Sequence, residues 1–280
     1  SHLKTPIMQW SDAIGKQHAR CADTPRIVSL VPSLTELLVD LGLAEYLVGR
    51  TGFCIHPRQI VRRLPKVGGT KGFSIDKLRA LAPTHVLVNI DENRREEVDA
   101  LHAFVPQVIV THPLTVRDNL ALYELLGGIF GGDPQVEARS RALAADFERE
   151  WAALCTQTGT LPRQSVLYLI WQQPWLSVAR DTYISRMLAA AGWDSLPADS
   201  ALRYPEVDLP ALAREADWLL LASEPYAFRE RHLRQLAEQL PGARATLIDG
   251  EMVSWYGSRA IRGLAYLRQL RARLASSPRS

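Results

Sequence analysis

Short apolar runs alternate with segments of helical periodicity along most of the chain. The first run, Arg26 to Leu30, is followed by Ser33-Leu34-Thr35-Glu36, where Ser33 is suited to cap a helix and Glu36 to bond back to the cap. A stripe of leucines continues the pattern, at Leu34, Leu37, Leu38 and Leu41. Gly42 stands where helices commonly end. This stretch predicts a buried strand followed by an amphipathic helix.

The same alternation continues through the N-terminal half. Further strands are predicted at Leu47 to Thr51, Thr84 to Ile90 and Val105 to Thr111. Helices are predicted from Ser74 to Leu81 and, after the polar segment Asp91 to Arg95, up to Ala103. The polar segment could bond to the polar rim of a ligand or cap the helix that follows, and Asp91 is expected to cap it. Strands that alternate with helices favour a parallel sheet with helices on its faces.

A helical pattern from Thr115 to Phe130 stops at Gly131-Gly132-Asp133-Pro134, and a second one runs unbroken from Pro134 to about Cys155. At 1.5 Å per residue the second helix would be ~33 Å long, enough to join two lobes as a strut. The alternation then resumes, with strands predicted at Ser165 to Trp171, Asp217 to Ala222 and Ala245 to Ile248, and helices at Thr182 to Ala191, Asp208 to Glu215, Arg229 to Gln239 and Ser258 to Leu274.

The two halves also align with each other. The segment from Ser74 to Val88 matches the segment from Asp208 to Ala222 without gaps, at a constant offset of 134 residues. In both copies a capped helix leads into a buried strand that opens onto a polar loop, Asn89 to Arg95 in the first and Ser223 to Arg229 in the second. Ligands of open α/β sheets bind outside the carboxyl ends of the strands, so two such lobes predict one shared cleft.

Composition narrows the possible functions. The 280 residues suit two domains, and 33 Lys and Arg against 30 Asp and Glu give a net charge of only +3 with mixed signs, which argues against a nucleic-acid partner. No run of 18 apolar residues exists, and the polar start from Ser1 to Arg20 is not a secretory signal. The expected location is therefore periplasmic if a leader was removed and cytoplasmic otherwise. Three cysteines, Cys21, Cys54 and Cys155, imply no disulfide framework.

Several short motifs resemble a known family. They are Arg26-Ile27-Val28-Ser29-Leu30-Val31-Pro32-Ser33-Leu34-Thr35-Glu36, Val48-Gly49-Arg50, Val67-Gly68-Gly69, Leu81-Ala82-Pro83 and Trp255-Tyr256. Together they resemble the helical-backbone, or class III, periplasmic binding proteins, which include the cobalamin-binding and iron-siderophore-binding components of ABC importers. The resemblance runs from about Arg26 to Leu274 and is greatest to the cobalamin-binding branch.

That resemblance implies an α/β fold of two Rossmann-like lobes with parallel sheets, joined by a long backbone helix, with the ligand cleft between the lobes. The implied domains are an N-terminal lobe over 26–114, linking helices over 115–157 and a C-terminal lobe over 158–275. It also implies a set of ligand-binding positions, namely Phe53, Lys71, Asn89, Trp175, Tyr204 and Trp255. Lys71 and Asn89 stand where cobalamin binders place tryptophans. The positions that would dock an ABC permease are Asp76 and Pro210, of which only Asp76 is acidic.

The residues themselves suggest further contacts. Aromatic side chains in the loops after strands offer rigid faces for a flat chelate, at Phe53, Trp171, Trp175, Tyr204, Tyr226, Trp255 and Tyr256. Among these, Trp171 is expected in the core, and Trp255 and Tyr256 are expected to be the most exposed. Arginines in the same loops could pair with anionic groups of a ligand, at Arg180, Arg203, Arg229 and Arg259.

Protein-held metal and catalysis have little support. His56, His85, His102, His112 and His232 show no paired ligand spacing, and no cysteine pair accompanies them. Haem needs one axial ligand, which Tyr204, Tyr226, Tyr256 or His56 could supply. Nucleophile-elbow, phosphate-loop and dinucleotide motifs are absent, and Gly68-Gly69-Thr70-Lys71-Gly72 is better explained as a tight turn.

The sequence therefore predicts a monomeric, non-enzymatic solute-binding protein without an intrinsic cofactor. Its ligand would be a metal chelate, whether cobalamin or another corrinoid, haem or a ferric siderophore, captured between the lobes for an ABC importer. An alternative keeps the same fold as a leaderless cytoplasmic carrier, sensor or enzyme for a smaller ligand.

Overall fold

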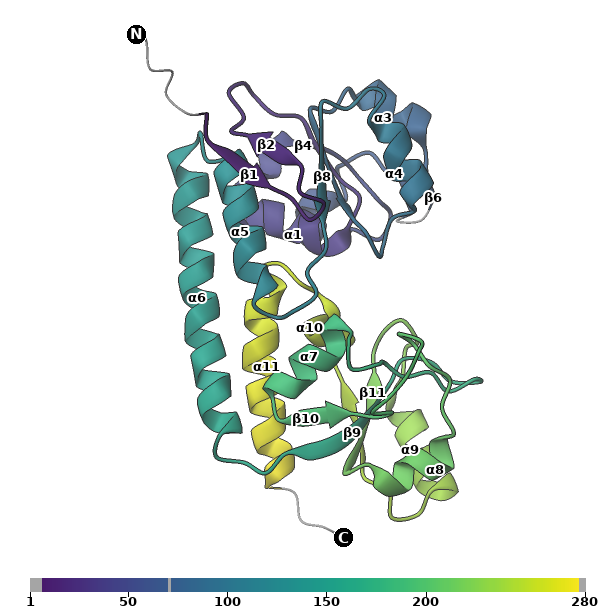
Figure 1. Ribbon diagram of the computed structural model, residues 1–280. Coiled ribbons are helices and arrows are strands. Elements are labelled where there is room, and N and C mark those ends of the chain that lie inside the picture. Colours follow the sequence, from purple (N-terminus) through teal and green to yellow (C-terminus); the bar gives the residue numbers. More distant parts are fainter. Residues whose placement is uncertain (1–6, 70–71, 277–280) are drawn as a thin grey trace. The chain divides into compact units, whose positions relative to one another are not determined.

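The computed structural model describes residues 7–69 and 72–276, and the chain divides into two compact units. Unit 1 comprises residues 1–113, 117–146 and 256–259, and unit 2 comprises residues 114–116, 147–255 and 260–280. Each unit contains one parallel four-stranded sheet flanked by helices (Figure 1). The α/β class predicted from the sequence is confirmed.

The sheet of unit 1 has the order β4-β3-β7-β8. Its strands are β3 (Ile27–Ser29), β4 (Leu47–Arg50), β7 (His85–Asn89) and β8 (Gln107–Thr111), and all adjacent pairs are parallel. Every residue of β3 and β7 is buried. These strands are near-continuous apolar runs because helices cover both faces of a parallel sheet.

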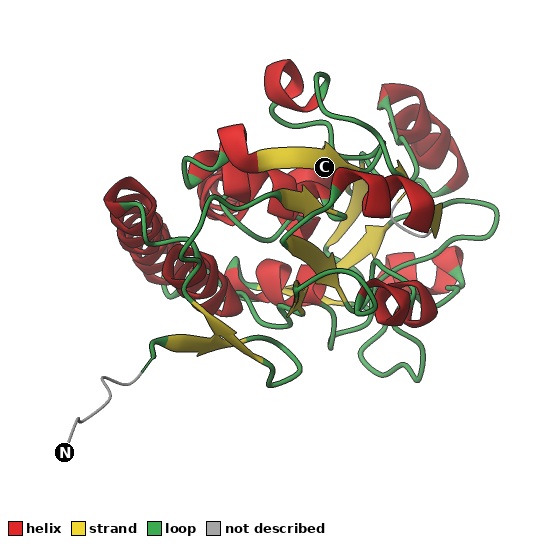
Figure 2. Ribbon diagram, turned by 90° about the horizontal axis from the view of Figure 1, so that it is seen from above, coloured by secondary structure: helices red, strands yellow, loops and turns green. Residues whose placement is uncertain are grey.

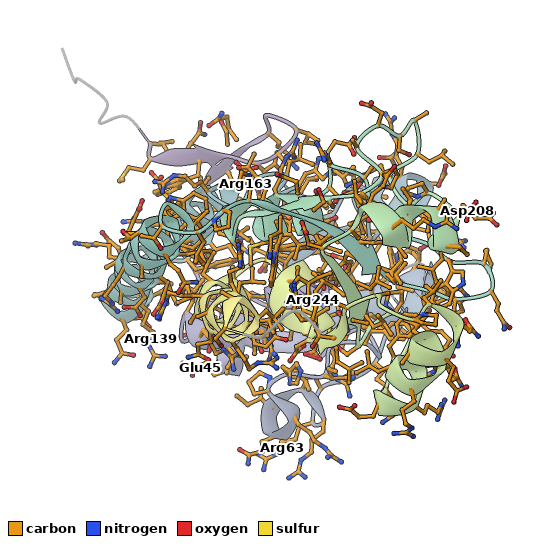
Figure 3. All side chains as sticks on the ribbon, turned by 90° about the horizontal axis from the view of Figure 1, so that it is seen from below. Glu45, Arg63, Arg139, Arg163, Asp208 and Arg244 are labelled. Carbon is orange, nitrogen blue, oxygen red and sulfur yellow. The ribbon has the colours of Figure 1, made fainter. Side chains whose placement is uncertain are left out.

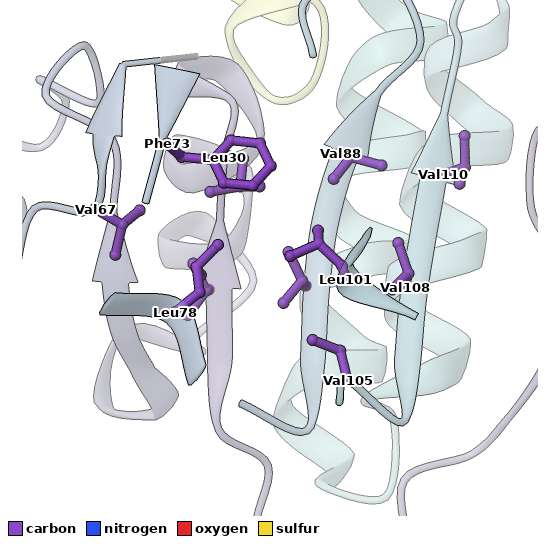
Figure 4. Close-up of a cluster of buried hydrophobic side chains, with 11 residues drawn as sticks. Leu30, Val67, Phe73, Leu78, Val88, Leu101, Val105, Val108 and Val110 are labelled. Carbon is purple, nitrogen blue, oxygen red and sulfur yellow. The ribbon is translucent and has the colours of Figure 1, made fainter. Parts of the chain in front are cut away.

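The helices of unit 1 bury the two faces of this sheet. They are α1 (Pro32–Asp40), α2 (Arg58–Val61), α3 (Ile75–Leu81), α4 (Arg95–Leu101) and α5 (Asp118–Ile129), with a 3-10 turn at Ala44–Tyr46. Figure 4 shows one face, where valines of β7 and β8 surround Leu101 of α4, and Leu78 of α3 lies beside Leu30 and Val67. The leucine stripe of α1 is fully buried, as its spacing predicts.

Two short hairpins lie outside the predicted elements. β5 (Gly68–Gly69) pairs with β6 (Gly72–Phe73), and β1 (Gln9–Ser11) pairs with β2 (Gln17–Ala19) near the N-terminus (Figure 2). The β1–β2 hairpin is held by His18, whose fully buried ring lies 2.8 Å from Asp12 Oδ2 and 2.7 Å from Gln107 Oε1. Asp12 also accepts the Val110 N–H of β8. The hairpin is thereby fixed to the edge strand of the sheet.

The long helix predicted from the Pro134 restart is α6 (Pro134–Thr158). It begins in unit 1 and ends in unit 2, with the division after Asp146. All of α5 therefore belongs to unit 1, whereas α6 is shared by the two units. The domain boundaries expected from the sequence remain a prediction.

Unit 2 repeats the arrangement of unit 1. Its sheet order is β10-β9-β11-β12, formed by β9 (Gln164–Leu169), β10 (Trp193–Ser195), β11 (Trp218–Ala222) and β12 (Ala245–Ile248). Its helices are α7 (Tyr183–Ala190), α8 (Leu209–Glu215), α9 (Glu230–Gln239), α10 (Gly250–Ser254) and α11 (Arg259–Ala275), the last beginning at the final residue of unit 1. Leucines of β9 and β11 pack against α8 and α9.

The internal repeat inferred from the sequence is confirmed. Adding 134 to the bounds of α3 gives those of α8, and the two helices are capped alike, by Ser74 accepting the Lys77 N–H and Asp208 accepting the Ala211 N–H. The strands that follow, β7 and β11, are fully buried. Each is the third strand of its sheet along the chain, and both sheets have the same spatial order, 2-1-3-4 in that numbering.

Two predicted helix caps are wrong. α1 begins at Pro32 with Val31 at the N-cap and no side-chain cap, and Glu36 pairs with Arg259 instead of bonding back to Ser33. α4 begins at Arg95, and Asp91 does not cap this helix. Asp91 Oδ2 lies 3.0 Å from His112 Nε2. In both cases the acidic side chain contacts a residue far away in sequence, and not the backbone N–H groups at the start of the helix, as local spacing had predicted.

A buried histidine makes unit 1 sensitive to acid. The pKa of His85 falls to about 4, first because burial disfavours its charged form and second because His18 lies nearby. Between pH 6.5 and 4 the unfolded chain therefore binds a proton that the folded chain does not, so stability falls as pH falls. The loss attributable to His85 should reach about 3 kcal/mol, at 1.36 kcal/mol per pKa unit.

We expect His85→Gln to flatten the dependence of unfolding free energy on pH between 6.5 and 4, measured by urea denaturation. His102→Gln, at an exposed position, is the matched control and should keep the wild-type slope. Equal slopes for His85→Gln and wild type would contradict this assignment.

Candidate binding edges

The carboxyl end of each sheet is the place where this topology can bind a ligand. With the strands of each sheet numbered along the chain, their order in the sheet is 2-1-3-4. The chain leaves strand 1 toward one edge of the sheet and strand 3 toward the other, and ligands usually bind in the crevice outside the carboxyl ends of these two strands. These strands are β3 and β7 in unit 1, and β9 and β11 in unit 2. We call the loops that follow them the binding edges of the two units.

Two buried asparagines hold the loop at the binding edge of unit 1 in place. Asn89 Oδ1 accepts the N–H groups of Asp91 at 2.8 Å and Glu92 at 3.3 Å. Asn93 Oδ1 accepts the Asn89 N–H at 2.9 Å, and its Nδ2 donates to the Leu30 carbonyl at 3.2 Å. Asn89 and Asn93 are both buried. The two amides thus tie the end of β7 to the end of β3, and Asn89 has a structural role beside the ligand contact predicted for it.

The segment Tyr256–Arg259 forms part of unit 1 although its neighbours in sequence belong to unit 2. Gly257 donates to Asn119 Oδ1 at 2.7 Å, and its carbonyl accepts from Tyr123 Oη at 2.7 Å. Ser258 Oγ donates to Asp40 Oδ2 at 2.5 Å. Gly257 has a φ of +82°, which a side chain would strain.

Arg259 is held at the end of this segment by a buried ion pair. Its Nε and Nη2 donate to the two carboxylate oxygens of Glu36 at 2.9 and 2.7 Å, and the side chains are only 9% and 4% exposed. The planar guanidinium matches the carboxylate with two parallel bonds, so the pair is geometrically specific. This arrangement places Arg259 in the core of unit 1.

Aromatic side chains gather at the binding edge of unit 2. Trp175 stacks on Phe228 with centroids 6.1 Å apart and planes inclined by 2°. Trp171 meets Tyr226 edge to face at 5.3 Å, and Tyr226 lies 4.6 Å from Phe228. Such clusters fix ring orientation and give rigid apolar faces.

Hydrogen bonds fix Tyr226 within this cluster. His232 Nδ1 accepts the Arg229 N–H at 2.8 Å, so the ring hydrogen sits on Nε2, which lies 3.3 Å from Tyr226 Oη. Gln172 Nε2 donates to the same oxygen at 2.5 Å. Tyr226 therefore receives two hydrogen bonds and keeps its own hydroxyl proton for another acceptor.

A cavity of about 450 Å³ adjoins these residues within unit 2. Trp175, Tyr226 and His232 contribute to its wall, together with Gln172, Gln173, Arg231, Gln235, Leu236 and Gln239. Two predicted binding residues, Trp175 and Tyr226, therefore line one concave surface.

The other predicted residues lie in varied surroundings. Phe53 is 63% exposed and Tyr204 is 48% exposed, with the Arg203 guanidinium 5.9 Å from the Tyr204 ring. Arg180 is exposed and donates to the Ser195 carbonyl, and Arg229 is exposed before α9. Trp255 is half-buried and its Nε1 donates to Glu224 at 3.0 Å. Lys71 lies outside the described residues.

Three expectations about exposure are wrong. Trp255 is half-buried and not among the most exposed rings, whereas Phe53 is 63% exposed. Trp171 is 40% exposed and not a core residue, because β9 ends at Leu169 and the chain turns outward. Tyr256 is only 9% exposed, although it was expected to be among the most exposed rings, and its hydroxyl donates to Glu92. Burial and the nearby Glu92 carboxylate both raise the pKa of Tyr256.

Three residues of the edges were not predicted as site residues, namely Glu36, Glu224 and Phe228, and His232 was considered only as a possible metal ligand. Glu36 and Glu224 have partners 223 and 31 residues away, which local pattern does not reveal. Glu224 and Phe228 do lie in the polar loop after a strand, which was the one signal the sequence offered. Within residues 7–69 and 72–276 no cluster of His, Cys and carboxylates suits a metal ion. No helix of these residues is long and apolar enough to cross a membrane.

A family model for periplasmic binding proteins matches residues 27–244 of the chain. The chain belongs to the periplasmic binding protein family. A vitamin B12-binding protein of Vibrio parahaemolyticus is 24% identical over 219 residues, 78% of each chain. A vitamin B12-binding protein of Photorhabdus laumondii is 24% identical over 190 residues, 68% of this chain and 67% of that one. The resemblance drawn from the sequence motifs is confirmed.

Solved structures of the family share the fold. The periplasmic vitamin B12-binding protein of Vibrio cholerae superposes with a TM-score of 0.76 at 17% identity, covering 90% of this chain and 98% of that one. The periplasmic haem-binding protein of Roseiflexus sp. RS-1 gives 0.75 at 24% identity, covering 91% and 100%. The binding edges therefore belong to a fold that these periplasmic proteins also adopt.

The ion pair of Arg259 can be tested against an exposed pair. Arg259→Met should lower the free energy of unfolding by about 3–5 kcal/mol, because it leaves the Glu36 carboxylate buried without its partner. Arg163→Met is the matched control: Arg163, labelled in Figure 3, pairs with Asp194 at 2.7 Å with side chains 49% and 38% exposed. It should cost no more than about 1 kcal/mol. Equal losses in urea denaturation would refute a special role for Arg259.

Proposed function

We propose that this protein is a solute-binding protein that captures a corrinoid, noncovalently, at the binding edges of its units. The observation that carries the proposal is the aromatic cluster at the carboxyl edge of unit 2, in a chain whose relatives include vitamin B12-binding proteins. A corrin ring is broad and flat, so aromatic faces bind it by burying apolar area.

The cluster supports binding and not turnover. His232, the obvious candidate base, uses Nδ1 to accept the Arg229 N–H, and its Nε2 faces Tyr226. Both ring nitrogens thus hold the loop in place. The relatives are likewise named as binding proteins. We therefore assign noncovalent capture as the activity.

Haem is the second candidate ligand. Similar folds include haem-binding proteins, and Tyr204 is an exposed phenol that could act as an axial ligand. Tyr226 and Tyr256 are less suited to this role because their hydroxyls already bond to His232 and Glu92. Ferric siderophores are a third class of candidate ligand.

We also propose that the protein delivers its ligand to an ABC permease. Asp76 is the second residue of α3 and its side chain is 97% exposed, which suits pairing with a basic partner. The equivalent position of the repeat is Pro210, the second residue of α8, which carries no charge. Docking would therefore be electrostatically stronger through unit 1 than through unit 2.

The first experiment measures thermal shift and absorbance with cyanocobalamin, cobinamide, haemin and a panel of ferric siderophores. A ligand that binds only the folded state stabilises it, by about 2.7 kcal/mol at a hundred times its Kd. We expect a saturable shift with the corrinoids. A shift with haemin or a siderophore alone would replace the proposed ligand class, and no shift with any probe would contradict the proposal.

Tyr204→Ala and Phe53→Ala then test the aromatic contacts. Both rings are largely exposed, so we expect unfolding free energies within about 0.5 kcal/mol of wild type. Loss of one stacking contact of about 1.4 kcal/mol should weaken cobalamin binding about tenfold. Ile14→Ala, which removes an exposed apolar side chain of the N-terminal hairpin turn, should leave affinity unchanged. Unchanged affinity in both aromatic variants would argue against these contacts.

A further inference from the structure

Glu224 lies at the binding edge of unit 2, two residues beyond the end of β11. Its backbone is packed against the start of α10: a Cβ on Gly250 would lie 2.8 Å from Glu224 Cγ and 3.1 Å from its backbone nitrogen. Gly250 N–H also donates to Ser223 Oγ at 2.8 Å. The position of Glu224 is therefore restricted by the start of α10.

One oxygen of the Glu224 carboxylate holds the end of α10. Glu224 Oε1 accepts from Trp255 Nε1 at 3.0 Å and from Ser254 Oγ at 3.1 Å. Ser254 is the last residue of α10 and Trp255 is its C-cap. An indole has a single N–H donor, so this bond restricts how the Trp255 ring can turn.

The other oxygen is presented to solvent. Both hydrogen bonds of the Glu224 side chain in the described part of the chain end on Oε1. Four side-chain atoms of the described residues are fully buried and have no hydrogen-bond partner: Glu97 Oε2, Tyr168 Oη, Trp218 Nε1 and Arg268 Nε. Glu224 Oε2 is not one of them. An unpartnered atom outside that set is at least partly accessible to solvent.

The surroundings of Glu224 are acidic. Burial raises the pKa of its carboxyl group most, and Glu251 and Asp249 raise it further, against the opposite effect of the two hydrogen bonds. Tyr168 is buried close enough for Glu224 to raise its pKa as well. This corner of the edge thus disfavours added negative charge.

We infer that Glu224 determines ligand specificity at the edge of unit 2. Oε1 fixes the Trp255 ring, and Oε2 accepts hydrogen bonds from ligand N–H groups while repelling ligand carboxylates. A corrinoid carries amide groups around its ring, and haem carries two carboxylates, so Glu224 selects the first class over the second. This inference rests on the proposed function and names the residue that narrows it.

The test compares Kd values for cyanocobalamin and haemin in the full chain. Glu224→Gln keeps an acceptor for Trp255 and Ser254, removes the charge and replaces Oε2 by a donor. We expect its ratio of haemin Kd to cyanocobalamin Kd to fall at least tenfold below wild type. Glu224→Ala also removes the anchor for Trp255 and should weaken cyanocobalamin binding about tenfold.

Two further variants separate the parts of the inference. Trp255→Phe removes the indole donor and should weaken both ligands without changing their ratio. Glu251→Gln removes a neighbouring charge and should lower the ratio less than Glu224→Gln does, so that an equal or larger change there would overturn the assignment to Glu224.

The outcomes distinguish this inference from the proposed function. A wild-type protein that binds neither probe would refute both. A wild-type protein that binds cyanocobalamin, with an unchanged ratio in Glu224→Gln, would refute the inference alone. Melting temperatures of all variants without ligand show that each is folded before its affinities are compared.

Discussion

The buried ion pair between Glu36 and Arg259 is the contact on which the other positions at the edge of unit 1 depend. Removing two charges from water is costly, and the paired geometry of the guanidinium and carboxylate offsets that cost. The chain enters unit 1 at Tyr256 and leaves it after Arg259. These four residues are bonded to α1, α5 and the loop after β7. The four residues are consequently held within unit 1.

The repeated order 2-1-3-4 explains why binding groups collect where they do. Each sheet has one pair of neighbouring strands whose connections part, and the side chains after those strands have room for a ligand. The two edges differ in chemistry. At the edge of unit 1, buried asparagine side chains bond to the backbone. At the edge of unit 2 lie stacked aromatic rings and the Glu224 carboxylate. A shared cleft remains a prediction from the sequence. The specificity we propose comes from the second edge.

Local pattern predicted the elements that are stabilised locally or buried continuously, as α3 with its Ser74 cap, β7 and α6 show. It failed where a distant partner decides the outcome. The β1–β2 hairpin depends on His18 meeting Gln107, 89 residues away, and Glu36 leaves its expected capping role for a partner 223 residues away. The exposure of Tyr256 was mispredicted for the same reason, since its hydroxyl finds its partner in Glu92, 164 residues away.

Hydrogen–deuterium exchange with and without saturating cyanocobalamin tests the central claim most directly, because it locates the ligand without assuming which side chains bind it. The account predicts slower exchange in the loops at residues 89–94 and 223–229, at the carboxyl ends of β7 and β11. It predicts no change at residues 82–84 and 215–217, at the opposite ends of the same strands. Protection confined to those opposite ends, or none anywhere, would contradict a corrinoid-binding role for these edges.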